Sequence, residues 1–392
     1  MLKIIHCADI HAGRPAVEEL DPPKASIRRR EIETSLSRIV DLARRESADL
    51  LLIAGDLFEH LYARPSWVKE ASALLRSISQ TRVFITPGNH DPVVRGSLYR
   101  GIEWPGNVTV FQSSRVTPVD LDGIPVVIHG FGWTSFQDRS QPLKGYVALR
   151  PDLINILVIH GDLAGKDMVA HSQYLPIPFS DLENSGMDYV ALGHIHAPGE
   201  FRAGKTVAAY PGCPEPLDFG DEGERGVFMV RIGEKSGPVA KVETEFIPMA
   251  TRQVRKVDLD ITGFDTPERV LNAVLQCGDE DSRRRDLWAV SLTGMADPEL
   301  GLDLPVIERE AGEGFFFLKL VPEYRPAYDL ATLGDSRRDT LEARFVREMQ
   351  AQISAAAKGG DERAAKVTEN ALYYGLDALR QGKILLRKGG SD

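Results

Sequence analysis

Five short apolar segments, each ending in glycine or polar residues, constrain the fold of this 392-residue chain more than any other feature of its sequence. Each has the length and continuity of a strand that is buried on both faces. Helix-like segments at residues 25–46 and 65–79 separate the first three strands from one another. This alternation predicts an α/β domain built in layers. The five apolar segments are residues 2–8, 49–55, 82–88, 155–161 and 188–194.

The ends of these segments carry the unusual polar residues of the chain. In open α/β sheets, ligands bind beyond the carboxyl ends of the strands, so we expect these side chains to gather at one site. The glycines among them would let the backbone turn sharply and approach that site closely. A histidine pair such as His194 and His196 can also be an ordinary hydrogen-bonding pair. The ends read Asp9-Ile10-His11, Gly55-Asp56, Gly88-Asn89-His90-Asp91, His160-Gly161 and Gly193-His194-Ile195-His196.

Together the polar ends offer oxygen and nitrogen donors and no thiolate. Such a donor set suits Mn(II), Fe(II) or Zn(II) better than a cysteine-bound structural zinc. Seven candidate ligands are too many for one ion, and they fit two ions that share a bridging carboxylate. Enzymes use that arrangement to clamp a phosphate ester and to make a metal-bound water nucleophilic.

The blocks and their order resemble the signature of the calcineurin-like metallophosphoesterases, which reads D-x-H, G-D, G-N-H-D/E, H and G-H-x-H. The resemblance implies an αββα sandwich of two mixed sheets flanked by helices. It also implies two divalent metal ions, expected to be Mn(II), with Asp56 as the bridge between them. The implied ligands are Asp9, His11, Asp56 and His196 for one ion, and Asp56, Asn89, His160 and His194 for the other.

The same resemblance gives catalytic roles to His90 and Asp91. His90 would face the scissile phosphate as a general acid or transition-state stabiliser, and Asp91 would orient its imidazole. Local sequence does not separate His129 in VVIHGFGW from His160 in LVIHGDL. The resemblance favours His160, because the fourth block of the family lies shortly before G-H-x-H. The other histidines, His6, His60 and His171, are expected to be structural or surface residues.

Three further segments resemble the SbcD-type DNA double-strand-break repair nucleases, a group that includes YhaO-like proteins. They are the opening IIHCADIHAGR, the block GDLFEHLYARPSWV and the segment AAYPGCPEPLDFGDEGERGVFMV at residues 208–230. This resemblance implies a DNA 3′ to 5′ exonuclease with endonuclease activity on single strands. Two alternatives remain: a phosphodiesterase for small substrates such as cyclic nucleotides, and a DNA-end-binding scaffold with a weak metal site. The chain departs from the pattern at Glu59, where many of these nucleases have His or Asp, and at Cys213, which replaces Ser or Thr.

The resemblance to the SbcD-type nucleases implies that the chain contains three parts. Residues 1–250 would form the nuclease domain, and residues 251–330 a small α+β capping domain that orients DNA or, alternatively, a dimerisation or structural appendage. Its sharpest basic run is Arg283-Arg284-Arg285. Residues 331–392 would form C-terminal helices that dock an SMC-like ATPase of the SbcC type, or that pack on each other or on the capping domain. Their apolar stripes are Leu341, Phe345, Met349 and Ile353, and Val367, Leu372, Tyr373, Leu376 and Leu379.

Charge and composition limit the class of protein. The formal net charge of −10 argues against a protein that coats nucleic acid by bulk attraction, although a local basic path is compatible with it. Three cysteines without metal-site spacing favour a reducing compartment. No apolar run reaches the roughly 18 residues of a membrane span, and the N-terminal segment lacks the apolar core of a signal peptide. We therefore expect a cytoplasmic protein without membrane contact. We also expect a homodimer.

Overall fold

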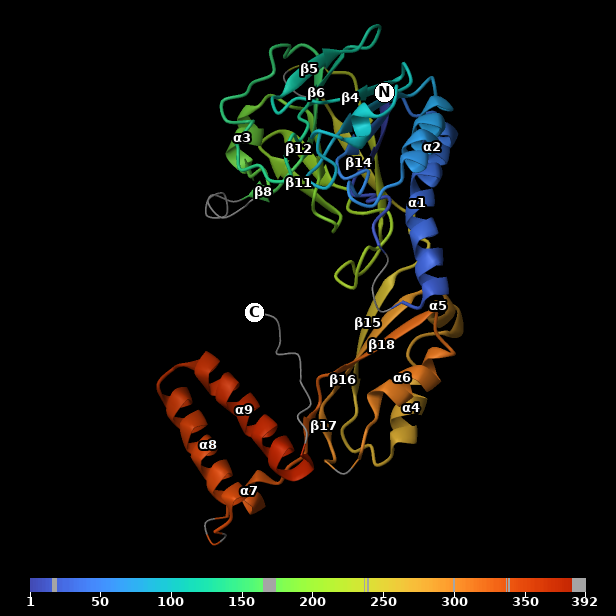
Figure 1. Cartoon of the computed structure of the whole chain (residues 1–392). Helices are drawn as coiled ribbons and strands as arrows, with labels where there is room; N and C mark the ends of the chain where they lie inside the picture. The colour runs from blue at the N-terminus through green and yellow to red at the C-terminus, as the bar shows by residue number, and fades with distance from the viewer. Residues whose placement is uncertain are drawn as a thin grey trace. The chain divides into compact units, whose positions relative to one another are not determined.

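A computed structural model of the chain describes residues 1–15, 20–164, 174–235, 237, 240–298, 300–335, 337 and 339–382 (Figure 1). The chain divides into two compact units, Met1–Gln253 and Val254–Asp392. Within the described residues, no helix is both long and apolar enough to span a lipid bilayer.

Two mixed sheets form the centre of the first unit. Their strand orders are β14-β13-β1-β2-β3-β4 and β11-β12-β10-β7-β6-β5. The strands β1 to β4 run parallel in one sheet, as do β6, β7, β10 and β12 in the other, and the remaining strands pair antiparallel. The first sheet contains β1 Leu2–Cys7, β2 Leu50–Ala54, β3 Arg82–Thr86, β4 Val108–Val110, β13 Gly226–Ile232 and β14 Val242–Pro248. The second contains β5 Thr117–Asp120, β6 Val126–Gly130, β7 Ile154–His160, β10 Tyr189–Gly193, β11 Gly199–Ala203 and β12 Thr206–Tyr210.

Alternate residues of each central strand enter different hydrophobic clusters, which explains why the strands read as continuous apolar runs. Ile4 of β1 packs in a cluster that contains residues of both sheets, whereas Ile5 packs against residues of helices α1 and α2. The outer face of the second sheet packs with the short helix α3, Phe179–Asn184, and with residues of nearby loops. The layers are therefore helix, sheet, sheet, helix, and the predicted fold class is confirmed.

Local sequence signals explain where the two long helices begin. Helix α1, Pro22–Arg45, starts with proline, and the side chain of Asp21 caps it by accepting a hydrogen bond from the backbone N–H of Lys24 (2.9 Å). Helix α2, Pro65–Arg76, also starts with proline. Both helices agree with the predicted segments 25–46 and 65–79 to within three residues.

His6 joins the two sheets directly beneath their carboxyl ends. Its Nδ1 lies 2.8 Å from the hydroxyl of Tyr189, and its Nε2 lies 3.1 Å from the carbonyl oxygen of Leu192. A neutral imidazole satisfies both contacts, with Nε2–H donating and Nδ1 accepting. Burial, only partly opposed by the hydrogen bond to Leu192, lowers the pKa of His6 to about 3.

A pH-dependent loss of stability should follow from this buried histidine. Above pH 6.5 neither the folded nor the unfolded chain charges His6, but below it the unfolded chain binds a proton that the fold excludes. Between about pH 7.5 and about pH 5.5 this difference should lower the free energy of unfolding by about 1.4 kcal/mol. Urea unfolding in a chelator measures the free energy of unfolding at each pH. Between these two pH values, the free energy of unfolding should fall by about 1.4 kcal/mol more in the wild type than in His6→Gln. Equal pH dependence in the two proteins would contradict the prediction.

The second unit begins with a three-stranded parallel sheet in the order β15-β16-β18. Helices α4 and α6 contribute Val270, Val274, Ile307 and Ala311 to the cluster that covers one face of this sheet. The short helix α5 also belongs to this unit. The bounds are β15 Val254–Asp260, α4 Pro267–Leu275, α5 Glu280–Arg285, β16 Leu287–Thr293, β17 Met295–Ala296, α6 Leu304–Gly312, β18 Phe317–Pro322 and β19 Arg325–Pro326.

Helices α8, Leu341–Lys358, and α9, Glu362–Gln381, follow the short helix α7, Leu330–Leu333, and pack on each other (Figure 1). Much of the predicted apolar stripe lies inside this pair. Leu372, Tyr373 and Leu376 are buried, and Phe345, Met349 and Ile353 pack against the same cluster. For most residues of the stripe, the structure therefore shows packing of the two helices on each other, which was one of the two alternatives. The exposed members are Leu341, Val367 and Leu379, at 73%, 62% and 46% exposure.

Candidate metal centre

The loops after β1, β2, β7 and β10 meet at the carboxyl ends of both sheets, and backbone hydrogen bonds hold them together. The N–H of Asp9 donates to the carbonyl of Gly55 (3.1 Å), and the N–H of His11 donates to the carbonyl of Asp56 (2.8 Å). From the second sheet, the N–H of His194 donates to Oδ2 of Asp9 (3.1 Å). The polar strand ends therefore lie at one site, as the strand pattern predicts.

The backbone at this site is strained. Six described residues other than glycine have a positive φ, and four of them are Asp9 (52°), His11 (49°), Asp56 (50°) and His194 (105°). Such conformations cost on the order of 1–3 kcal/mol each and persist only where the surrounding structure enforces them. Their concentration here indicates that the loops are shaped to aim particular side chains.

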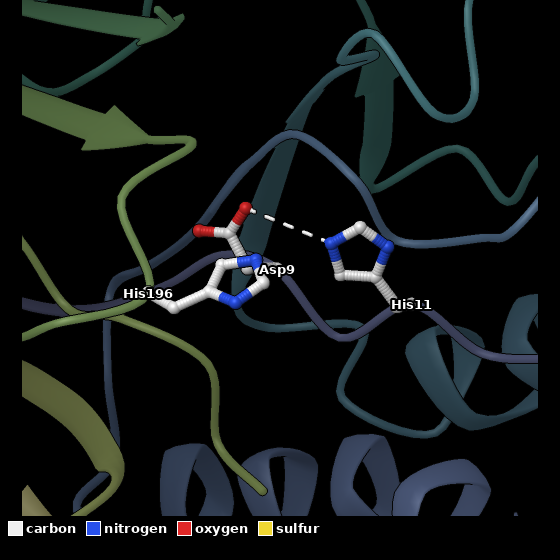
Figure 2. A group of neighbouring side chains, drawn as sticks. All are labelled: Asp9, His11 and His196. Atoms are coloured by element: carbon white, nitrogen blue, oxygen red, sulfur yellow. Dashed lines mark ion pairs between the residues drawn. The ribbon is translucent and has the colours of Figure 1, made fainter. Parts of the chain in front are cut away.

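Asp9, His11 and His196 form the first cluster, drawn in Figure 2. Each offers one ligand atom, and the three atoms lie within 4.8 Å of one another. The Nε2 of His11 is 4.0 Å from Oδ1 of Asp9. All three residues lie in loops that follow β1 and β10, so this cluster draws on both sheets.

Asp9, Asp56 and His160 form the second cluster, with ligand atoms equally close. The Nε2 of His160 faces two oxygens: Oδ2 of Asp56 at 3.2 Å and Oδ1 of Asn89 at 3.0 Å. The same Oδ2 of Asp56 is 3.5 Å from Nε2 of His11. Asp56 therefore faces ligand atoms of both expected sets, and Asp9 belongs to both clusters.

The imidazole rings of three histidines are held from outside the site. The Nδ1 of His11 lies 3.2 Å from Oε2 of Glu59, and the Nδ1 of His160 lies 2.9 Å from the carbonyl oxygen of Ala54. The Nδ1 of His196 lies 3.3 Å from Oδ1 of Asp221. Metal-bound histidines show this pattern, because the outer hydrogen bond fixes the tautomer that leaves Nε2 to bind the ion. The Nε2 of His11 is buried and has no hydrogen-bond partner among the residues that the structure describes. The donor set therefore fits divalent metal ions.

His194 differs from the other expected ligands. Its Nε2 lies 3.3 Å from Oδ1 of Asp162, and its ring centroid is 5.3 Å from that of His160. The structure thus brings Asp9, His11, Asp56, Asn89, His160 and His196 together and places His194 beside them, in contact with Asp162.

The charges of the site compensate one another. Burial alone would raise the pKa of Asp56, but the charges of His160, His11 and His90 outweigh burial and hold that pKa well below its usual range. Burial lowers the pKa of His160, whereas the Asp56 carboxylate raises it, and the net pKa lies above the ordinary value. Bound protons here supply positive charge that divalent ions would supply instead, so metal binding should release protons.

His90 borders the clusters and remains partly exposed, with 41% of its side chain accessible. Its backbone N–H donates to Oδ1 of Asp56 (2.9 Å), and its Nδ1 lies 3.1 Å from Oε1 of Glu59. The hydrogen bond with Glu59, partly opposed by burial, raises the pKa of His90. The raised pKa favours the protonated form of this imidazole at the edge of the site.

The expectation that Asp91 orients His90 is wrong. The Asp91 carboxylate accepts hydrogen bonds from the backbone N–H groups of Gly88 (2.6 Å) and Phe58 (3.1 Å) and from the hydroxyl of Tyr99 (2.5 Å). It therefore ties together the loops after β2 and β3. Glu59 contacts the imidazole instead.

His129 lies apart from both clusters. Its Nδ1 is 2.8 Å from the hydroxyl of Tyr146, and its Nε2 is 3.1 Å from Oδ1 of Asn155. Both ring nitrogens are therefore engaged away from the site, in contrast to His160. His6 is buried between the sheets, His60 contacts the ring of Phe136, and His171 lies outside the described residues.

Comparison with known proteins identifies the family of the chain. The profile described as calcineurin-like phosphoesterase matches residues 2–198. The chain belongs to the calcineurin-like phosphoesterase family. It is 30% identical over 239 residues to the metallophosphoesterase YhaO of Bacillus subtilis, covering 59% of this chain and 57% of YhaO. It is also 30% identical over 293 residues to the DNA double-strand break repair protein Mre11 of Aeropyrum pernix, covering 70% of this chain and 68% of that protein.

The match to YhaO thus spans little more than half of that relative's length. Among solved structures, TT1561 of Thermus thermophilus is 15% identical, with a TM-score of 0.39, over 62% of this chain and 98% of its own.

Three acidic residues around this calcineurin-like phosphoesterase site were not predicted as contacts. In the sequence, Glu59 stands out only as a departure from the family pattern, yet its carboxylate bridges His11 and His90. Burial alone would raise the pKa of Glu59, but hydrogen bonds with His11 and His90 lower it to about 2. Asp162 follows His160 by two residues, and Asp221 lies in the segment FGDEGE, but neither spacing indicates a histidine partner.

Cys213 also lies close to a proposed ligand. It forms a group with His196 and Asp221 whose ligand atoms are within 4.8 Å of one another. Burial raises the pKa of its thiol well above the ordinary value. The side chain is therefore a neutral, buried packing group, as expected for a residue that replaces Ser or Thr.

Gly193 allows the family's two sheets to approach each other at the site. A Cβ atom at this position would collide with the carbonyl oxygen of Ala54 and with the ring of His160. The expectation that glycines at the strand ends permit close approach is confirmed here.

Proposed function

We propose that this chain is a metal-dependent phosphodiesterase that cleaves DNA, as a 3′ to 5′ exonuclease with endonuclease activity on single strands. The observation that carries the proposal is a pair of adjacent ligand clusters, one with His11 and His196 and one with His160, beside the partly exposed His90. Asp9 belongs to both clusters, and the Asp56 carboxylate faces a histidine of each. Two divalent ions in such clusters supply Lewis-acid charge to a phosphoryl group. We propose Mn(II) for both. One ion would be held by Asp9, His11, Asp56 and His196, and the other by Asp56, Asn89, His160 and His194.

The relatives support DNA as the substrate. One of them is named as a DNA double-strand break repair protein, and its match extends over 293 residues. This is more than the 253 residues of the first unit. We therefore propose that residues 251–330 act as a capping domain that helps to orient DNA. A homodimer is part of the same proposal.

Incubation of the purified protein with Mn(II) and end-labelled DNA tests the function. Single-stranded and double-stranded oligonucleotides should both be offered, with a small phosphodiester as the control substrate. We expect shortening of the DNA from its 3′ end. Hydrolysis of the small ester alone would favour a small-substrate phosphodiesterase, and DNA binding without any cleavage would favour an end-binding scaffold.

Replacing His90 should separate chemistry from metal binding. His90→Asn is expected to lower turnover by about 10²- to 10⁴-fold, because a general acid is lost. Both metal ions should remain, since the side chain contacts Glu59 and lies outside the proposed ligand set. Kinetics and elemental analysis measure the two effects, and His60→Asn in the neighbouring loop serves as the matched control. Loss of metal from His90→Asn would show that its role is misassigned.

We propose that an SMC-like ATPase docks on the α8 and α9 pair. Because most of the apolar stripe packs inside the pair, the exposed Leu341 and Val367 are the residues to test. Leu341→Glu with Val367→Glu should abolish co-purification with the coiled coil of the ATPase, because charged groups would enter an apolar contact. Lys366→Glu, at an exposed neighbouring position, is the control. Unchanged pull-down of the doubly substituted protein would place the docking surface elsewhere.

A further inference from the structure

We infer that a cavity beside the metal centre binds an unpaired DNA strand, with arginines on its phosphates and Tyr62 on a base. The inference rests on the proposed function and names the form of DNA that reaches the site. The cavity, called here the arginine cavity, has a volume of about 500 Å³. Its lining comes from helix α1 and from the loops after β1 and β2, and consists of Gly13, Ser26, Arg29, Arg30, Glu33, Tyr62 and Arg64.

The arginine cavity adjoins the metal centre through two loops. Gly13 follows the proposed ligand His11 by two residues. The backbone N–H of Tyr62 donates to the carbonyl of Glu59 (2.9 Å), and the Glu59 side chain contacts both His11 and His90. A strand with one phosphate at His90 would therefore have its neighbouring nucleotides within reach of this cavity.

In the run Arg28-Arg29-Arg30, the first arginine is buried in ion pairs and the other two are exposed. Arg28 is 3% exposed, and its guanidinium pairs with Glu31 (2.5 Å) and Glu215 (3.2 Å). Arg29 and Arg30 are exposed, and neither forms an ion pair with any residue that the structure describes. Their charges are thus available for a ligand.

The cavity concentrates positive charge on an acidic protein. Among its lining residues, three arginines face one carboxylate, Glu33, which lies 3.3 Å from Arg64. The whole chain carries a formal net charge of −10. A local cluster of guanidinium groups against that background is what phosphate recognition requires.

An exposed aromatic ring favours an unpaired strand as the ligand. Tyr62 is 56% exposed and the adjacent Leu61 is 78% exposed. Proteins bind single strands by tracking the backbone with positive charge and stacking bases on aromatic side chains. A base inside a duplex is already stacked on both faces, so only an unstacked base can use the Tyr62 ring.

Fluorescence anisotropy with a labelled short single strand tests the inference. Every full-length sample should carry its metals and the His90→Asn substitution, so that binding is measured with cleavage suppressed. Arg29→Ala with Arg30→Ala should weaken binding and lower the slope of log affinity against log salt by about 1.4, for two lost phosphate contacts. Tyr62→Ala should weaken binding by at least about fivefold, and Tyr62→Phe should restore it.

Matched controls separate this site from general charge effects. Arg76→Ala with Arg82→Ala removes the same charge from exposed positions, at the end of α2 and at the amino end of β3. This control should keep the wild-type salt slope. A slope equal to that of the wild type in the Arg29 and Arg30 variant would overturn the inference. So would a blunt duplex that binds as well as the single strand and loses as much affinity in Tyr62→Ala.

The outcomes distinguish this inference from the proposed function. If DNA is cleaved but the arginine and tyrosine variants bind it normally, the function stands and the arginine cavity has no role in it. If the variants lose binding but no DNA is cleaved under any metal, the binding site stands and the nuclease proposal fails.

Discussion

Asp56→Ala should remove both metal ions from the protein at once. Its carboxylate faces His160 (3.2 Å) and His11 (3.5 Å), which belong to different proposed ligand sets. A bridging carboxylate holds two ions, so its loss should leave neither at normal occupancy. Elemental analysis after equilibration with Mn(II) measures the effect, and activity on DNA should disappear with the metal.

Two variants control for the special position of Asp56. Asp9→Ala removes a carboxylate that is a proposed ligand of the first ion only, although it also lies near Asp56 and His160, and it should leave more metal bound. Asp56→Asn retains an acceptor for the N–H of His90, so the local fold is preserved while the charge is lost. Similar single-ion losses in Asp56→Ala and Asp9→Ala would argue against a bridged pair.

His160→Ala should abolish activity and weaken metal binding, whereas His129→Ala should leave both intact. His160 directs Nε2 at Asp56 and Asn89, while both ring nitrogens of His129 bond to Tyr146 and Asn155. Removing His129 should therefore cost about 1–3 kcal/mol of folding free energy, the usual cost of leaving buried polar groups unpaired.

Metal titration and DNA cleavage measure the first effect, and urea unfolding measures the second. The two histidines occupy neighbouring parallel strands, β6 and β7, in similar local sequences, so each is a matched control for the other. Metal loss from His129→Ala with retention in His160→Ala would reverse the assignment.

The strand pattern predicts the location of the site because the carboxyl ends of buried parallel strands converge whatever the loops do. It does not predict which neighbours hold each ligand. Asp91 follows His90 directly in sequence, yet its carboxylate turns to Gly88, Phe58 and Tyr99. Glu59 reaches His90 from another loop, 31 positions away in sequence, and no spacing rule gives that contact.

The apolar stripes of α8 and α9 show a second limit. A stripe at helical spacing predicts that something covers it, and a neighbouring helix satisfies the pattern as well as a partner protein does.

Runs of charged residues are equally ambiguous. In Arg283-Arg284-Arg285, Arg284 pairs with Glu280 (3.0 Å) and Arg285 with Asp286 (2.9 Å), so the conspicuous run is partly neutralised. The less conspicuous Arg29 and Arg30 form no ion pair within the described part of the chain.

Neither sheet of the first unit contributes a complete set of the proposed metal ligands. Asp9, His11, Asp56 and Asn89 follow strands of one sheet, and His160, His194 and His196 belong to the other. Ions bound by ligands from both sheets would cross-link them, so the sheets could not separate without releasing metal. A chelator would then act on this unit as a mild denaturant, and its melting temperature would report the concentration of free metal in the solution.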